Sequence, residues 1–140
     1  MNWDKLDEQL TEIVKKRNQL SEMDYSDESY DDLEEALHDL EDDFNEEYED
    51  IFEPQLEKIY AKLKSDTDIL VPTAYLANKY KEMLPDAKGI VTYEVSGSEG
   101  VPIESDELGK VDMRIVLVPN PARFVLLING NQLKELWKSR

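Results

Sequence analysis

The feature that most constrains the fold is a stripe of apolar residues at helical spacing within an acidic stretch. The intervals along the stripe are three or four residues, the period of one face of an α-helix, and its members are Leu33, Leu37, Leu40, Phe44, Tyr48 and Ile51. Four more apolar residues carry the stripe across Pro54, namely Phe52, Leu56, Ile59 and Leu63. Because proline lacks a backbone donor and clashes with the preceding turn, we expect one long helix with a kink at Pro54.

Two more helices are predicted around this one. From residue 3 to residue 20 the apolar positions again follow a helical period, and Asn2 is a suitable N-cap. The long helix is expected to begin near Ser29, where Ser29 and Asp32 resemble a capping box, so that the first two helices form an antiparallel hairpin. A short third helix is expected to start at Pro72 and to end before Pro85.

After Gly89 the hydrophobic period changes to about two, and β-branched residues replace helix formers. This change predicts strands over residues 90–95, 110–118 and 123–128, arranged as a three-stranded antiparallel β-meander. Asn131 is then expected to cap a C-terminal helix that carries Leu133, Leu136 and Trp137. The predicted fold class is therefore α+β.

The chain is expected to form a single domain over residues 1–140, because a sheet of three strands cannot cover its own apolar face. The strand over 110–118 is apolar on both sides, with Val116 and Val118 on one side and Met113, Ile115 and Leu117 on the other. When both faces of a sheet are apolar, each face is covered by another part of the protein or by a partner subunit. Either the C-terminal helix with Trp137 covers the second face, or a partner subunit does so in a homodimer.

The net charge of −17 lies entirely in the first half of the chain. Residues 1–70 hold 24 acidic and 7 basic residues, whereas residues 71–140 hold 9 of each and are neutral. Such a charge disfavours direct binding to nucleic acid or to an anionic membrane surface. The chain has no cysteine, no secretory leader and no apolar run long enough to cross a bilayer, so a cytoplasmic location is expected.

Eighteen acidic residues and no basic residue lie between Asn18 and Lys58. Projected at helical spacing, seven carboxylates fall opposite the apolar stripe and form what we call the acidic ridge: Glu28, Asp31, Glu35, Asp42, Glu46, Glu49 and Glu53. Ten like-charged pairs four residues apart oppose helix formation in this region. The acidic ridge is either a solvated outer face or a docking surface for a basic protein or peptide, and Tyr25 and Tyr30 in the connector are further candidate contact residues.

No catalytic residue, cofactor site or metal site is predicted. The single histidine, His38, follows Glu35 at the spacing used in carboxylate-bridged di-iron bundles, but those sites need a second such motif, which this chain lacks. The first functional hypothesis is an interaction module that binds or neutralises a basic partner through the acidic ridge. The alternative is a homodimeric structural or regulatory domain that uses its sheet and the loop over residues 96–109, and an enzyme of unidentified type is the third hypothesis.

Overall fold

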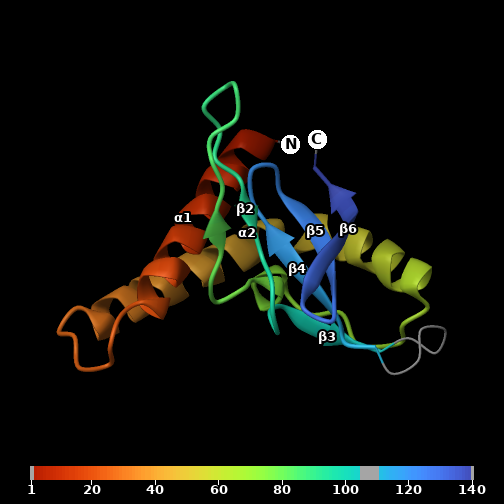
Figure 1. The fold of residues 1–140 in the computed structure, drawn as a ribbon, viewed down its shortest axis with the longest axis horizontal. Helices are drawn as coiled ribbons and strands as arrows, with labels where there is room; N and C mark the ends of the chain where they lie inside the picture. The colour runs from red at the N-terminus through yellow and green to blue at the C-terminus, as the bar shows by residue number, and fades with distance from the viewer. Residues whose placement is uncertain (1, 105–110, 140) are drawn as a thin grey trace.

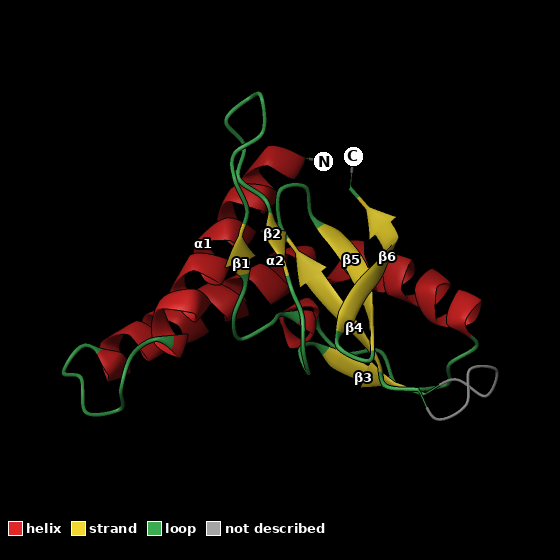
Figure 2. Cartoon of the chain, viewed as in Figure 1, coloured by secondary structure: helices red, strands yellow, loops and turns green. Residues whose placement is uncertain are grey.

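The chain folds as a helical hairpin packed against a small antiparallel sheet, so the α+β class is confirmed (Figure 1, Figure 2). The computed structural model describes residues 2–104 and 111–139. In chain order the elements are α1 (Trp3–Ser21), α2 (Tyr30–Leu63), the 3-10 turn η1 (Pro72–Tyr75), β1 (Lys81–Glu82), β2 (Tyr93–Glu94), β3 (Val101–Ile103), β4 (Met113–Val118), β5 (Arg123–Ile128) and β6 (Asn131–Lys138).

The two predicted long helices are present, and α2 continues through Pro54 as one helix. Asn2 caps α1, since its side-chain oxygen accepts a hydrogen bond of 3.0 Å from the backbone N–H of Lys5. The capping box predicted for α2 is wrong, because Ser29 makes no side-chain cap bond. Its backbone is already near helical geometry, with φ −86° and ψ −6°, whereas a capping side chain needs an extended residue.

The buried face of α2 changes partner along the helix. In the first half Leu37, Phe44 and Tyr48 are buried, and the Tyr48 hydroxyl donates a hydrogen bond to Gln9 of α1. In the second half Phe52 packs edge-on against Phe124 of β5 and Trp137 of β6, with ring centroids 5.6 and 5.7 Å apart. The first half of α2 therefore packs against a helix and the second half against the sheet.

The main sheet has four antiparallel strands in the order β3-β4-β5-β6, so the predicted three-stranded meander and the C-terminal helix are wrong. Asn129 and Gly130 have φ values of 51° and 84°, the paired positive angles of a tight hairpin turn, which returns the chain antiparallel to β5. Two register shifts interrupt the pairing of β5 with β6, and Leu136 lies in one of them, between the partners of Phe124 and Val125. The sequence spacing of Leu133, Leu136 and Trp137 resembles a helical period, and the bulges allow a strand to accommodate it.

Three other predicted elements also differ from the structure. The short helix expected from Pro72 is a single 3-10 turn, and the chain after it forms β1, which pairs with β2 in a separate two-stranded sheet. The strand expected over 90–95 is limited to β2. The loop expected over 96–109 contains β3, which pairs with β4, and the predicted start of the next strand at residue 110 lies outside the described residues.

The face of the main sheet opposite α2 is covered by residues 92–100 of the same chain. The buried Arg123 guanidinium donates to Thr92 Oγ1 at 3.1 Å and to the Tyr93 carbonyl at 3.0 Å. At Gly100, which has φ +83°, an added Cβ would lie 2.5 Å from Val116 Cγ2, so the chain crosses this face in close contact. The C-terminal helix predicted to cover this face is replaced by β6, and an uncovered face no longer argues for the homodimer, which stays a prediction.

Candidate protein-binding surface

The structure places the acidic ridge on the outer side of α2, as the apolar stripe predicts. All seven of its side chains are exposed. Six belong to α2, whereas Glu28 precedes the helix and lies in the connector between α1 and α2. From Asp31 to Glu53 a straight helix rises about 33 Å, at about 1.5 Å per residue.

Acidic residues on the flank of α2 that faces α1 are paired with basic residues. Arg17 Nε lies 2.7 Å from Glu41 Oε1, and Lys5 Nζ lies 3.2 Å from Glu47 Oε1. Hydrogen bonds from Lys5 and Gln9 lower the pKa of the Glu47 carboxyl. The first helix thus neutralises one flank of α2.

The acidic ridge has no such neutralisation within the described part of the chain. None of its seven carboxylates forms an ion pair or a side-chain hydrogen bond with another described residue. Two basic residues near the end of α1 pair elsewhere, Lys16 with Glu12 at 3.8 Å and Arg17 with Glu41. The ridge therefore presents its charge to solvent.

The expected repulsion along α2 is smaller than the sequence suggests. Asp27 and Glu28 lie before the helix, so the pairs 27/31 and 28/32 are not helical pairs and eight of the ten remain within Tyr30–Leu63. At about 0.2 to 0.5 kcal/mol for each pair, the cost at low salt is on the order of 2 to 4 kcal/mol. Packing of the opposite face must offset this cost.

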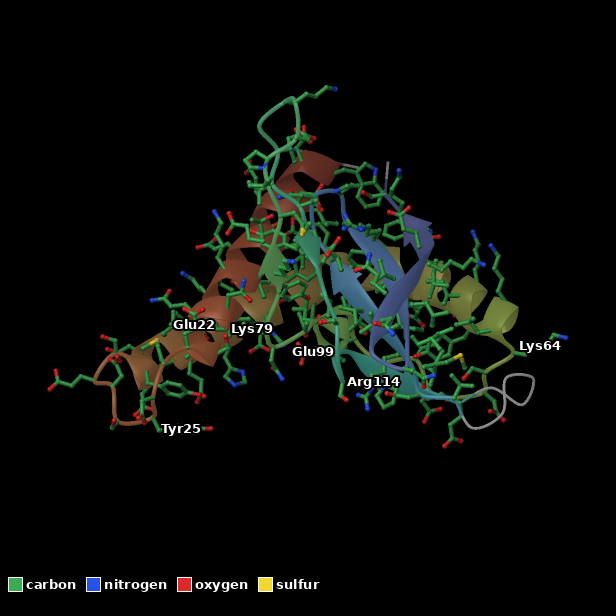
Figure 3. The ribbon with its side chains drawn as sticks, viewed as in Figure 1. Glu22, Tyr25, Lys64, Lys79, Glu99 and Arg114 are labelled. Carbon is green, nitrogen blue, oxygen red and sulfur yellow. The ribbon has the colours of Figure 1, made fainter. Side chains whose placement is uncertain are left out.

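The two candidate tyrosines lie together at the end of the hairpin. Tyr25 is 83% exposed and lies in the connector at the end of the helical hairpin (Figure 3). Its ring centroid is 4.7 Å from that of the half-buried Tyr30, at the start of α2. The pair extends the candidate surface from the acidic ridge onto the connector.

A groove that the sequence does not reveal borders the ridge at its other end. Glu49 and Glu53 line one part of it, and residues 69–72, which follow α2, line another. Its volume is about 130 Å³. Leu70 and Val71, which are adjacent in the chain, are 46% and 41% exposed there. Exposed apolar residues in the chain after a helix carry no periodic signal, so the sequence alone does not indicate this groove.

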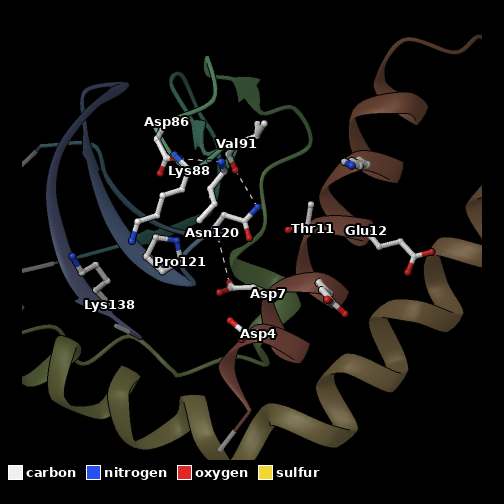
Figure 4. A pocket seen from close by; sticks show the side chains of 14 residues that line it. Asp4, Asp7, Thr11, Glu12, Asp86, Lys88, Val91, Asn120, Pro121 and Lys138 are labelled. Carbon is white, nitrogen blue, oxygen red and sulfur yellow. Dashed lines mark hydrogen bonds between the residues drawn. The ribbon is translucent and has the colours of Figure 1, made fainter.

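Two other hollows hold mixed charges. A cleft of about 1250 Å³ lies between α1, residues 86–91 and the Asn120–Pro121 turn (Figure 4). The buried Asp7 carboxylate on its floor accepts a hydrogen bond of 3.3 Å from the Asn120 N–H. The lining of the cleft includes five acidic residues and three lysines, so both signs of charge are present and neither forms a continuous surface. A second hollow of about 370 Å³ contains His38 together with Arg17 and Glu41.

Neither hollow gathers a recognisable catalytic set. Among the described residues, no three His, Asp or Glu side chains converge where they could hold a metal ion. The helices of the described part of the chain are also too polar or too short to cross a membrane. In comparisons with protein-family models, curated proteins and solved structures, no match to this chain was found.

Proposed function

We propose that this chain is a protein-protein interaction module that binds a basic protein or peptide through the acidic ridge on α2. One observation carries the proposal: carboxylates on one flank of α2 are paired with Arg17 and Lys5, whereas the ridge carboxylates have no cationic partner among the described residues. A partner that supplies lysine or arginine side chains would relieve the repulsion between them.

The rigidity of α2 supports this role. The helix holds the carboxylates in a fixed row because its opposite face is packed against α1 and the sheet. A partner would therefore not have to order the surface when it binds, which lowers the cost of association. A dense row of one sign of charge also speeds the encounter with an oppositely charged partner and makes binding sensitive to salt.

A binding experiment with a defined probe tests the proposal. The probe is a fluorescein-labelled peptide of about twelve residues, made of arginine and alanine, which in extended form covers about 40 Å and so matches the ridge. We expect the wild-type protein to bind it at low salt and to release it as salt is added, as measured by fluorescence anisotropy. Reversal of three ridge charges, Glu35→Lys, Asp42→Lys and Glu46→Lys, should weaken binding by at least about tenfold.

The matched control reverses three exposed carboxylates away from the ridge, Glu8→Lys, Glu82→Lys and Glu104→Lys. The two variants have the same net charge, so any difference between them reports the position of the charges. If the peptide does not bind, or if both variants weaken it equally, the ridge is not a docking surface. Equal weakening would favour a general effect of net charge, and the sheet with the loop over 96–109 would become the leading candidate surface.

The proposed location is the cytoplasm, where basic protein segments are available as partners. Expression of a fluorescent fusion in host cells, followed by imaging and fractionation, tests this location. Recovery of the fusion only in a membrane fraction or outside the cell would contradict it.

A further inference from the structure

We infer that the groove at the end of the acidic ridge receives one apolar side chain from the basic partner, so that the surface recognises a basic segment that carries an aliphatic anchor. This inference rests on the proposed function and adds a specificity element to it. Two independent features coincide at the groove: the charge of Glu49 and Glu53, and the exposed apolar side chains of Leu70 and Val71.

Hydrogen bonds hold the groove open by fixing residues 69–75 on α2. The Asn45 amide donates to Thr73 Oγ1 at 2.7 Å, and its oxygen accepts from the Thr73 N–H at 3.1 Å. The hydroxyls of Tyr60 and Tyr75 lie 2.7 Å apart, and the Tyr75 hydroxyl accepts a further bond of 3.2 Å from the Leu70 N–H. The backbone around Leu70 and Val71 is thus anchored to α2.

The shape of the groove matches one side chain rather than a chain segment. Its lining includes Leu56, which is 1% exposed, and the buried Pro72. A volume of about 130 Å³ corresponds to roughly four water molecules, at roughly 30 Å³ for each, which is enough for a leucine-sized group. An apolar side chain there would displace water from Leu70 and Val71 and gain the hydrophobic free energy of their burial.

Charge complementarity decides the class of partner. The carboxylates of Glu49 and Glu53 flank the groove, and Glu46 lies one turn earlier on the same side of α2. An acidic or neutral apolar segment would bring no compensating charge to these carboxylates, whereas lysine or arginine on either side of the anchor would pair with them. The fitting ligand is therefore a basic segment of another protein with one leucine-like residue between its charges.

Two peptides that differ only in the anchor test the inference. Both are arginine and alanine peptides of about twelve residues, and in one of them the third residue from each end is leucine, so that either direction of binding offers an anchor. We expect the leucine peptide to bind the wild-type protein about tenfold more tightly than the alanine peptide, because about half of each added methylene should be buried. For the variant Leu70→Ser/Val71→Ser, the ratio of the two peptide affinities should fall below about threefold.

The outcomes separate this inference from the proposed function. The inferred anchor is contradicted if the two peptides bind the wild-type protein with equal affinity. It is also contradicted if the ratio of their affinities is unchanged in the Leu70→Ser/Val71→Ser variant. Neither result would contradict binding through the acidic ridge. If neither peptide binds, or if reversal of the ridge charges leaves their affinities unchanged, the proposed function fails and the anchor fails with it. Both substituted side chains are more than 40% exposed, so the variant should fold.

Discussion

The two halves of α2 differ in charge and in what packs against them: residues 30–46 hold nine acidic residues and no lysine or arginine, whereas residues 47–63 hold five acidic residues and two lysines. The first half joins α1 in a hairpin whose end projects beyond the sheet, and there Leu33 is only half-buried and lies outside the core (Figure 1). The second half lies under an aromatic cluster that includes Phe52, Phe124 and Trp137. A helix can therefore present a continuous row of like charges when one part of its length is anchored strongly.

The difference also explains the position of the proposed binding surface. At the projecting end the acidic ridge meets the tyrosine pair of the connector, Tyr25 and Tyr30. At the anchored end it meets the groove of Leu70 and Val71, which the hydrogen bonds of Asn45 and Tyr75 fix in place. Shape selectivity therefore belongs to the anchored half, and long-range attraction belongs to the whole ridge.

The largest expected effect is the loss of the aromatic anchor. Phe52→Ala should lower the free energy of unfolding by about 3 to 5 kcal/mol, since Phe52 is fully buried between rings from two layers. Leu33→Ala at the projecting end should cost less than about 1.5 kcal/mol, because the half-exposed side chain leaves no closed cavity. Urea unfolding of both variants measures the contrast, and similar losses would remove the distinction between the two halves.

An intermediate effect on stability is expected at alkaline pH from Tyr60, whose hydroxyl shares a hydrogen bond with that of Tyr75. Burial and the hydrogen bond with Tyr75 raise the pKa of Tyr60, so the folded state retains a proton that the unfolded chain loses above about pH 10. The free energy of unfolding should thus be flat below that pH and then fall by about 1.4 kcal/mol per pH unit for each such tyrosine.

Burial also raises the pKa of Tyr80, which contributes in the same direction. Urea unfolding between neutral and alkaline pH gives the slope, and Tyr60→Phe is the matched variant because it removes one ionisable hydroxyl and keeps the ring. The variant should lose stability less steeply than the wild type above about pH 10. An identical slope would show that Tyr60 ionises as freely in the folded protein as in the unfolded chain.

The smallest expected effect is the relief of repulsion along the ridge. Glu46→Gln removes the like-charged pairs with Asp42 and Asp50, so the free energy of unfolding should rise by about 0.4 to 1 kcal/mol at low salt. The gain should vanish near about 1 M salt, where the screening length is about 3 Å. Glu82→Gln is the control, because Glu82 lies in β1 outside α2, and it should change stability by less than about 0.5 kcal/mol.

A stabilisation by Glu46→Gln that persists unchanged at high salt would contradict the electrostatic explanation. It would point instead to a difference in local packing or helix propensity. The thermal midpoint of the wild-type protein should rise with added salt for the same reason, since eight like-charged pairs lie within α2.

Features with a local cause could be predicted from the sequence. Periodicity and composition within short windows predict helices α1 and α2, the cap at Asn2, the passage of α2 through Pro54 and the strand β5. The exposure of the acidic ridge follows as well, because the side opposite an apolar stripe must face water. The C-terminal strand was also signalled by Asn129-Gly130, a hairpin turn dipeptide, but the bulged spacing of Leu136 and Trp137 imitated a helix.

The sequence by itself determined that an acidic amphipathic helical hairpin precedes a β-rich, neutral second half. Only the tertiary structure decided that the second sheet face is covered by residues 92–100, through the bonds of the buried Arg123. It also decided that Glu49 and Glu53 lie beside Leu70 and Val71. Periodicity reports which side of one segment avoids water, whereas the contact between distant segments depends on bonds such as those of Asn45 with Thr73, and no local pattern encodes these.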